Sequence, residues 1–132
     1  MMSPVFLRLD EVLALHREQI DLYGGAHGVR DVNLLLSALA MPAATFGNEF
    51  LHSTIQEMAA AYLFHISSNH PFVDGNKRAA LISAIAFLAI NDLALIADND
   101  ELEGLVMRVA DGKASKSEAA LFFEHSCRRN VT

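Results

Sequence analysis

The chain has 132 residues, a length that suits a single domain with a core of its own. Sixteen acidic and ten basic side chains give a net charge of −6, which argues against binding nucleic acid through a broad basic surface. The single cysteine, Cys127, cannot form an internal disulfide, so we expect the protein to work in a reducing cytoplasm. We expect no signal peptide and no membrane span, because the longest apolar stretch, 79–90, falls short of the about 20 residues that a bilayer requires.

The spacing of apolar residues is helical almost throughout, with little of the alternation typical of strands, and predicts an all-α bundle of about six helices. A first helix is expected over 11–23, capped by Asp10 and ended by the glycines at 24–25. A second helix is expected between Asp31 and Pro42. Its inner side should carry Val32, Leu35, Leu36 and Leu39.

The middle of the chain predicts two long helices. Ser53 and Gln56 form a candidate capping box for a third helix that ends near 68–69. Its expected core residues are Ile55, Met58, Ala59, Tyr62, Leu63 and Ile66. A central helix from about 77 to 90 is apolar on nearly all faces, as expected of a helix surrounded by others, and 91–92 closes it.

Two further helices, 100–110 and 116–127, complete the predicted bundle, the second opened by a capping box of Ser115 and Glu118. There is no internal repeat, low-complexity tract or linker, so we expect residues 1–132 to form one domain.

The segment 45–51 interrupts the helices with a Gly47-Asn48 turn between Phe46 and Phe50. One interpretation is a small hairpin, or flap. The other is a plain connector whose two aromatic rings pack on the core.

The densest group of reactive side chains runs from His70 to Arg78, just before the apolar run, and reads His-Pro-Phe-Val-Asp-Gly-Asn-Lys-Arg. His70 is the candidate general base, because an imidazole can accept a proton from a hydroxyl near neutral pH. Asp74 is a hard oxygen ligand suited to Mg²⁺. Taken alone, such a histidine would rather end a helix and bond to backbone carbonyls, and an Asp-Gly pair would form a turn. The surrounding residues favour the functional interpretation.

The end of this segment has the features of a phosphate site. Gly75 lets the backbone approach a phosphate closely, and Asn76 can present its amide beside the free N–H groups of the following helix. Lys77 and Arg78 add positive charge. In the alternative interpretation Asn76 is an ordinary helix cap and the two cations form a solvated helix start.

The segment fits the signature of the Fic/Doc superfamily, His-Pro-Phe-x-Asp/Glu-Gly-Asn-Gly/Lys-Arg, at every defined position. Within it the chain resembles the death-on-curing (Doc) toxin branch. Lys77 stands where most AMP-transferring Fic proteins have glycine, and Leu81 stands where they usually have a second arginine. The segments 24–31 and 34–42 also look like the Doc branch, so the resemblance covers most of the chain.

This resemblance implies the Fic/Doc fold and the toxin of a type II toxin–antitoxin system, which transfers the γ-phosphate of ATP to a Ser/Thr hydroxyl with the help of Mg²⁺. The implied target is translation elongation factor Tu. His70 would activate the hydroxyl, Asp74 would hold the metal, and Arg78 would steady the transferring group. The implied phosphate ligands are Gly75, Asn76, Lys77 and Arg78. The implied flap that positions the target consists of Phe46, Gly47, Asn48 and Glu49.

Restraint of such a toxin is expected from a second protein. No stretch of the chain completes the inhibitory Ser/Thr-x-x-x-Glu-Gly/Asn helix found in many Fic proteins. The resemblance therefore implies a separate antitoxin with a disordered tail that folds on binding. Val12, Leu15 and Ile20 are candidate docking residues, although we expect core packing for most of them.

Two other functions stay open at this point. One is an AMP transferase of the Fic type, which would move the α-phosphate. The other is a catalytically silent module that binds phosphate or a protein partner, against which the intact His70 and Asp74 count.

Overall fold

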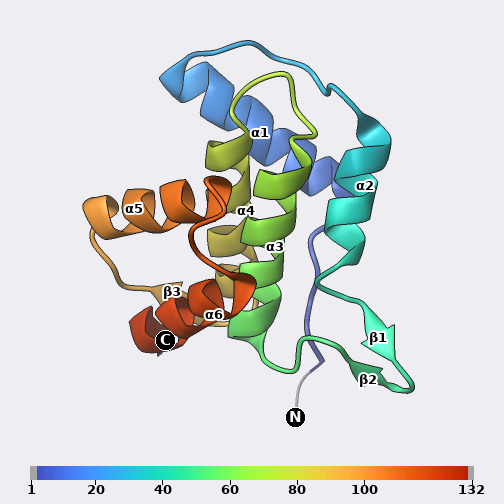
Figure 1. The fold of residues 1–132 in the computed structure, drawn as a ribbon, viewed down its shortest axis with the longest axis vertical. Helices are drawn as coiled ribbons and strands as arrows, with labels where there is room; N and C mark the ends of the chain where they lie inside the picture. The colour runs from blue at the N-terminus through green and yellow to red at the C-terminus, as the bar shows by residue number, and fades with distance from the viewer. Residues whose placement is uncertain (1–2, 131–132) are drawn as a thin grey trace.

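A computed structural model describes residues 3–130 and contains six helices in that part of the chain (Figure 1). They are α1 (Leu9–Tyr23), α2 (Val32–Ala40), α3 (Ile55–Asn69), α4 (Asn76–Ile90), α5 (Asn99–Ala110) and α6 (Lys116–Ser126). This confirms the predicted mainly helical fold. No helix among these residues is long and apolar enough to cross a membrane.

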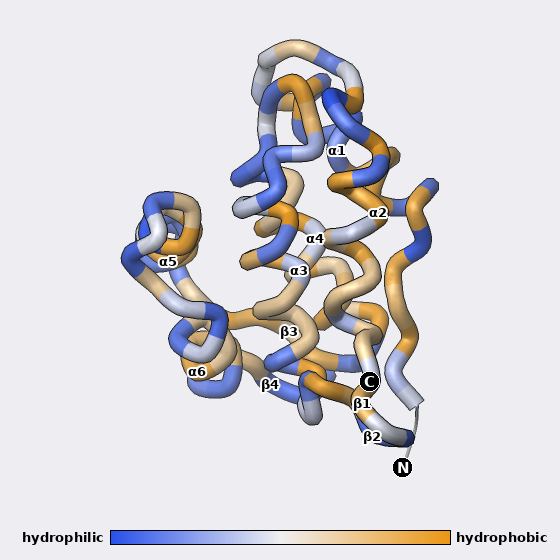
Figure 2. Tube along the Cα trace, turned by 45° about the vertical axis from the view of Figure 1, so that its right-hand side comes forward, coloured by the Kyte–Doolittle hydropathy of each residue, from blue (hydrophilic) through white to orange (hydrophobic). Residues whose placement is uncertain are grey.

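The core lies around α3 and α4, which stand side by side in the middle of the molecule (Figure 1). Small side chains allow the two helices to approach closely, because Ala59 to Ala61 on α3 and Ala79, Ala80 and Ala84 on α4 are all fully buried. Larger residues such as Tyr62 and Phe87 fill the space around them, with ring centroids 4.9 Å apart. Hydrophilic residues lie mainly along outer turns such as those of α5 and α6 (Figure 2).

Several helix ends follow the predicted local signals. Gly24 ends α1 with a φ of 88°, a conformation that glycine adopts without strain. The carboxylate of Asp31 accepts hydrogen bonds from the N–H groups of Asn33 and Leu34 and so caps α2. Ser115 and Glu118 form the predicted capping box of α6.

Two predicted caps are wrong by a residue or two. Helix α1 begins at Leu9 and not at 11, because the Arg8 N–H donates to the Glu11 carboxylate at 2.8 Å. Asp10 instead pairs with the Arg8 side chain, at 3.0 Å. The Thr54 hydroxyl, rather than that of Ser53, accepts from the backbone N–H three residues on and caps α3. Which of several adjacent candidates caps a helix depends on the direction of the incoming chain, which the local sequence leaves open.

Helix α2 buries a narrower face than predicted. Leu35 is fully buried and Leu39 partly so, but Val32 and Leu36 are 47% and 46% exposed. The reason is that α2 packs mainly against α3, on one side only. On α1, Val12 and Ile20 are buried, as expected of core residues, and therefore offer no docking surface.

The segment after α2 forms a hairpin, as one interpretation predicted. Strands β1 (Thr45–Phe46) and β2 (Glu49–Phe50) pair antiparallel around Gly47, which has a φ of 66°. The alternative prediction that both rings pack on the core is wrong for Phe46, which is 84% exposed. The Phe50 ring does contact the Phe6 ring, with 5.8 Å between centroids.

A second small sheet was not predicted. Strand β3 (Leu93–Leu95) pairs antiparallel with β4 (Cys127–Arg129), so Cys127 belongs to a strand and not to the last helix. Each strand has three residues, and the pairing joins residues 32 to 36 positions apart, which no local pattern reveals.

Candidate active site

The segment 70–75, called the motif loop below, joins α3 to α4 and lies against the loop that follows α1 (Figure 1). Backbone hydrogen bonds connect the two loops. The Arg30 N–H donates to the Pro71 carbonyl at 2.8 Å, and the Val73 N–H donates to the Gly28 carbonyl at 3.0 Å. The motif loop is therefore held by a segment about 40 residues earlier in the chain.

His70 is the residue directly after α3 and is exposed. Its φ of 48° is rare for a residue with a side chain and implies local strain. The Arg30 side chain stabilises this strained backbone by donating hydrogen bonds to the carbonyls of His70, at 2.8 Å, and Asn69, at 3.2 Å. Within residues 3–130 the His70 ring itself makes no hydrogen bond, so the alternative of a ring bonded to backbone carbonyls is wrong.

Asp74 presents an exposed carboxylate that backbone donors hold in place. The N–H of Ala26 reaches one carboxylate oxygen at 3.1 Å, and that of Gly75 reaches the other at 2.8 Å. These two hydrogen bonds, together with the nearby charge of Arg78, keep the pKa of the Asp74 carboxyl below its usual range. The group is therefore ionised at neutral pH, as a metal ligand must be.

This donor set fits Mg²⁺ shared with a phosphate. No group of three or more His, Cys, Asp or Glu side chains in the described part of the chain could hold a metal ion. Mg²⁺ often uses one or two carboxylates and takes its other ligands from substrate phosphates and water. A single oriented carboxylate such as that of Asp74 suffices for that arrangement.

Asn76 fixes the shape of the motif loop. Its side-chain oxygen accepts from the Phe72 N–H at 2.9 Å, and its side-chain nitrogen donates to the Phe72 carbonyl at 3.1 Å. The cap of α4 is Gly75, so the alternative of Asn76 as an ordinary helix cap is wrong. Gly75 has a φ of 75°, and a Cβ there would lie 3.0 Å from the end of the Ile20 side chain, so a larger residue would be strained on both grounds.

The two cations at the start of α4 differ in their surroundings. Lys77 is exposed and lines the pocket described below. The Arg78 guanidinium donates to the carbonyls of Gly24, at 2.9 Å, and Gln19, at 3.3 Å, at the end of α1. Arg78 therefore joins α4 to α1 in addition to the phosphate role predicted for it.

One central residue, His16, was missed from the sequence. This buried α1 side chain lies 2.8 Å from the Asp74 carbonyl oxygen, so its Nε2–H donates to that oxygen. The ring also stacks on Phe72, with centroids 3.8 Å apart and 6° between the planes. Burial lowers the pKa of His16, which favours the neutral ring. The spacing of Val12, His16 and Ile20 on one helix face was a signal that could have found it.

These side chains open into a pocket of about 450 Å³. Residues His70 and 73–78 line one side of it, and Ala110 and Asp111 at the end of α5 line the other. The site residues predicted between His70 and Arg78 thus come together around one cavity. The hairpin residues Phe46, Gly47, Asn48 and Glu49 do not line it.

Comparison with known proteins agrees with this geometry. Residues 6–88 match the sequence profile of the Fic/DOC family. The chain belongs to this family. It is 42% identical to "Toxin Doc" of Mycolicibacterium smegmatis over 90 residues. The matched segment covers 67% of this chain and 69% of that protein. It is 34% identical to "Protein kinase doc" of Escherichia phage P1 over 111 residues. That match covers 84% of this chain and 86% of the phage protein. Both relatives confirm the predicted resemblance to the Doc branch.

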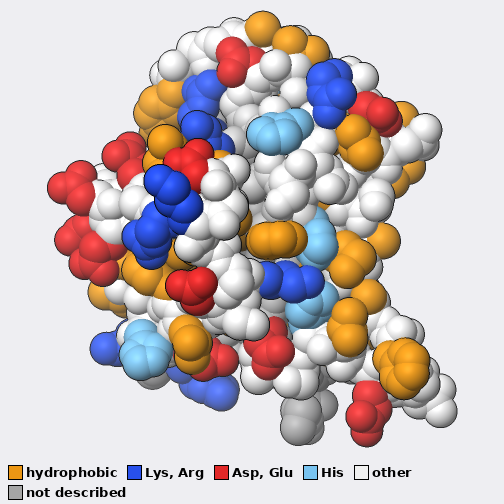
Figure 3. All heavy atoms as spheres, in the orientation of Figure 1, with side chains coloured by type: hydrophobic (Ala, Val, Ile, Leu, Met, Phe, Trp, Pro, Cys, Tyr) orange, Lys and Arg blue, Asp and Glu red, His pale blue; other side chains and the backbone are white. Residues whose placement is uncertain are grey.

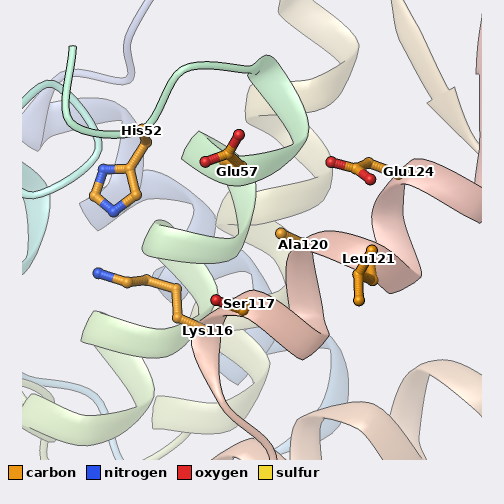
Figure 4. A pocket seen from close by; sticks show the side chains of 7 residues that line it. All are labelled: His52, Glu57, Lys116, Ser117, Ala120, Leu121 and Glu124. Atoms are coloured by element: carbon orange, nitrogen blue, oxygen red, sulfur yellow. The ribbon is translucent and has the colours of Figure 1, made fainter.

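A separate pocket of about 330 Å³ lies between the start of α3 and α6, away from the Fic/Doc motif (Figure 4). The side chains of His52 and Lys116 point toward each other there, and Glu57 and Glu124 lie on the other side. The Lys116 amine is 3.0 Å from the His65 ring. No residue of the Fic/Doc motif lines this pocket, so the motif pocket is the candidate active site.

Proposed function

We propose that this Fic/Doc protein is a Doc-type protein kinase that transfers the γ-phosphate of ATP to a Ser or Thr hydroxyl of a protein target. The motif pocket carries the proposal, because the His70 ring, which has no hydrogen bond within residues 3–130, the oriented Asp74 carboxylate and the Lys77 ammonium meet there. The relative named a protein kinase supports it, and that name implies the use of ATP.

Each residue has a role that its surroundings allow. The free N–H groups at the start of α4 and the Lys77 ammonium bind phosphate oxygens. Asp74 holds Mg²⁺, which neutralises charge on the transferring group when bound. His70 accepts the proton of the attacking hydroxyl, which is possible because its ring makes no competing hydrogen bond among the described residues. The Arg78 guanidinium donates to α1 carbonyls through Nη1, and its other nitrogens steady the transferring phosphate.

The partners follow from the same proposal. The target is translation elongation factor Tu, whose modification blocks translation in the cytoplasm. The exposed hairpin with Phe46, Gly47, Asn48 and Glu49 lies near the start of α3, whereas the motif loop follows its end (Figure 1), so the hairpin would bind a part of the target remote from the modified hydroxyl. A separate antitoxin with a disordered tail restrains the protein, and the relative named a toxin supports this arrangement.

The test is a transfer assay with purified protein, Mg²⁺ and bacterial lysate, run in parallel with γ-labelled and α-labelled ATP. We expect γ-label at a band the size of elongation factor Tu, lost in the His70→Ala variant. Label from α-ATP instead would identify an AMP transferase. No label from either, with a biological effect that survives His70→Ala, would identify a silent binding module.

A further inference from the structure

The pocket of about 330 Å³ between the start of α3 and α6 has no part in the proposed function, and its lining carries charges of both signs. The residues that matter for its chemistry are His52, Glu57, Lys116, Ala120, Leu121 and Glu124. On the face drawn in Figure 3, a cationic side chain lies beside histidine side chains over α3 and α6, with acidic side chains close by. The volume falls in the range of about 300–1,000 Å³ that is usual for small-molecule sites.

Lys116 forms the basic end of this pocket. Its ammonium lies 3.0 Å from Nε2 of the His65 ring and 5.7 Å from the centre of the Phe64 ring. The residue is partly buried, and this burial lowers the pKa of its amine. Neither of the ion pairs that form within residues 3–130 involves this ammonium. Because burying a charge without an opposite charge is costly, an anionic group brought by a ligand would stabilise it.

His52 adds unused hydrogen-bonding capacity at the same end. The residue is only 6% exposed, and one of its ring nitrogens points toward the Lys116 amine (Figure 4). The ring makes no hydrogen bond within residues 3–130, and its Nδ1 atom is buried. A neutral imidazole has one N–H to donate. An anion held by the Lys116 ammonium could therefore also accept a hydrogen bond from His52.

The opposite side of the pocket is acidic, because the carboxylates of Glu57 and Glu124 lie there (Figure 4). One Glu57 oxygen, Oε1, accepts hydrogen bonds from the hydroxyls of Ser53, at 3.0 Å, and Thr54, at 3.3 Å. Its other oxygen accepts none within residues 3–130, and Glu124 is exposed. Neither carboxylate forms an ion pair with Lys116 in this part of the chain. The pocket thus keeps opposite charges apart on its two sides.

We propose that this pocket binds a small zwitterion, an α-amino acid with an apolar side chain. The carboxylate of the amino acid pairs with Lys116 and accepts a hydrogen bond from His52. Its ammonium group lies between the carboxylates of Glu57 and Glu124. A simple anion would be repelled by these carboxylates and a simple cation by Lys116, whereas a zwitterion is attracted to both sides.

The α6 side of the pocket accounts for the apolar side chain of the ligand. Ala120 and Leu121 line this side, and Leu121 is 54% exposed. An apolar group placed against Leu121 removes apolar surface from water. The site goes beyond the proposed kinase activity and does not depend on it, because no residue of the Fic/Doc motif lines this pocket.

The test measures the binding of leucine to the full chain by calorimetry, beside two compounds that each lack one of its charges. These are 4-methylpentanoate, without the amino group, and 3-methylbutylamine, without the carboxylate. We expect leucine to bind about tenfold or more tightly than either. Lys116→Met and Glu124→Gln should each weaken leucine binding about five- to tenfold. Lys113→Met and Glu18→Gln remove the same charges at residues outside this pocket and should leave the affinity unchanged.

Nuclear magnetic resonance of the histidine rings locates the bound amino acid. Leucine should shift the ring signals of His52 and His65, which lie at the basic end of the pocket, and leave those of His16 and His70 unchanged. This measurement uses the wild-type protein and so does not depend on how well a variant folds. Far-ultraviolet circular dichroism shows whether each variant used in calorimetry keeps its fold.

Three results would overturn the amino-acid site and leave the proposed phosphoryl transfer untouched. The first is that leucine does not bind, or binds no more tightly than 4-methylpentanoate. The second is an unchanged affinity for leucine in folded Lys116→Met and Glu124→Gln. The third is a set of shifts confined to His16 and His70, which would place leucine at the motif loop.

Discussion

The buried ring of His16 on α1 donates a hydrogen bond to the carbonyl oxygen of Asp74 at 2.8 Å and stacks on Phe72. Through this pair, a helix near the start of the chain fixes the backbone of the carboxylate proposed to hold Mg²⁺. The Ala26 N–H, just after α1, fixes the carboxylate itself. The geometry of the motif loop therefore depends on α1 and on the segment that follows it.

We expect His16→Ala to lower kcat/KM for phosphoryl transfer roughly 100-fold, since small displacements of a reacting group cost about that much. His16→Gln should restore most of it, because the glutamine amide can donate to the same carbonyl. Transfer rates should be measured at a temperature where circular dichroism shows both variants folded. Equal losses in the two variants would mean that the hydrogen bond is not what matters.

The Asn76 side chain makes two hydrogen bonds to the backbone of Phe72. Asn76→Ala should lower the free energy of unfolding by about 2 kcal/mol, because each lost bond contributes about 1 kcal/mol. Asn76→Asp keeps the acceptor but places a carboxylate oxygen against the Phe72 carbonyl oxygen, so its loss should be at least as large as that of Asn76→Ala. Urea unfolding of the three proteins measures this order, and a smaller loss for Asn76→Asp would contradict it.

Lys77 is exposed and lines the motif pocket, so it is expected to contact the phosphates directly. Lys77→Gly should raise the KM for ATP about tenfold, because a hydrogen bond to a charged group contributes about 1.5–3 kcal/mol. It should also lower γ-label transfer and allow α-label transfer. Lys77→Arg retains the charge and should keep γ-label transfer. An unchanged KM in Lys77→Gly would place the lysine outside the site.

The hairpin offers a matched pair of aromatic residues. Phe46 is 84% exposed, so Phe46→Ser should change stability by no more than about 0.5 kcal/mol yet slow modification of the protein target. Phe50 lies 5.8 Å from the Phe6 ring, so Phe50→Ser should cost about 1–2 kcal/mol of stability. Thermal unfolding and γ-label transfer are measured for both. Normal target modification in folded Phe46→Ser would exclude the hairpin from target binding.

Stability should fall as the pH decreases from about 6.5 to about 4, partly because of His65. Burial, followed by the charges of Lys116 and His52, lowers the pKa of His65 from 6.5 to about 4. Between these values the unfolded chain binds a proton at this residue and the folded protein does not, so lower pH favours unfolding. Urea midpoints across this range measure the slope. His65→Gln should make it shallower, and an unchanged slope would exclude His65 as a cause.

The sequence by itself determined what depends on near neighbours. Gly24, the Asp31 cap and the Ser115–Glu118 capping box each end or begin a helix through contacts within three or four residues. The Fic/Doc motif is likewise one short stretch in which every reactive side chain is present. The family, the helical fold and the motif residues from His70 to Arg78 could therefore be predicted, whereas His16, Ala110 and Asp111 were not.

Only the tertiary structure decided how distant segments meet. His16 and Arg30 act on residues 58 and 40 positions away, and Arg78 bonds to the end of α1, 54 positions away. The β3–β4 sheet and the exposed Val32 also depend on what packs nearby. Helix spacing repeats within a few residues, whereas these contacts depend on how the whole chain packs, so no local pattern contains them.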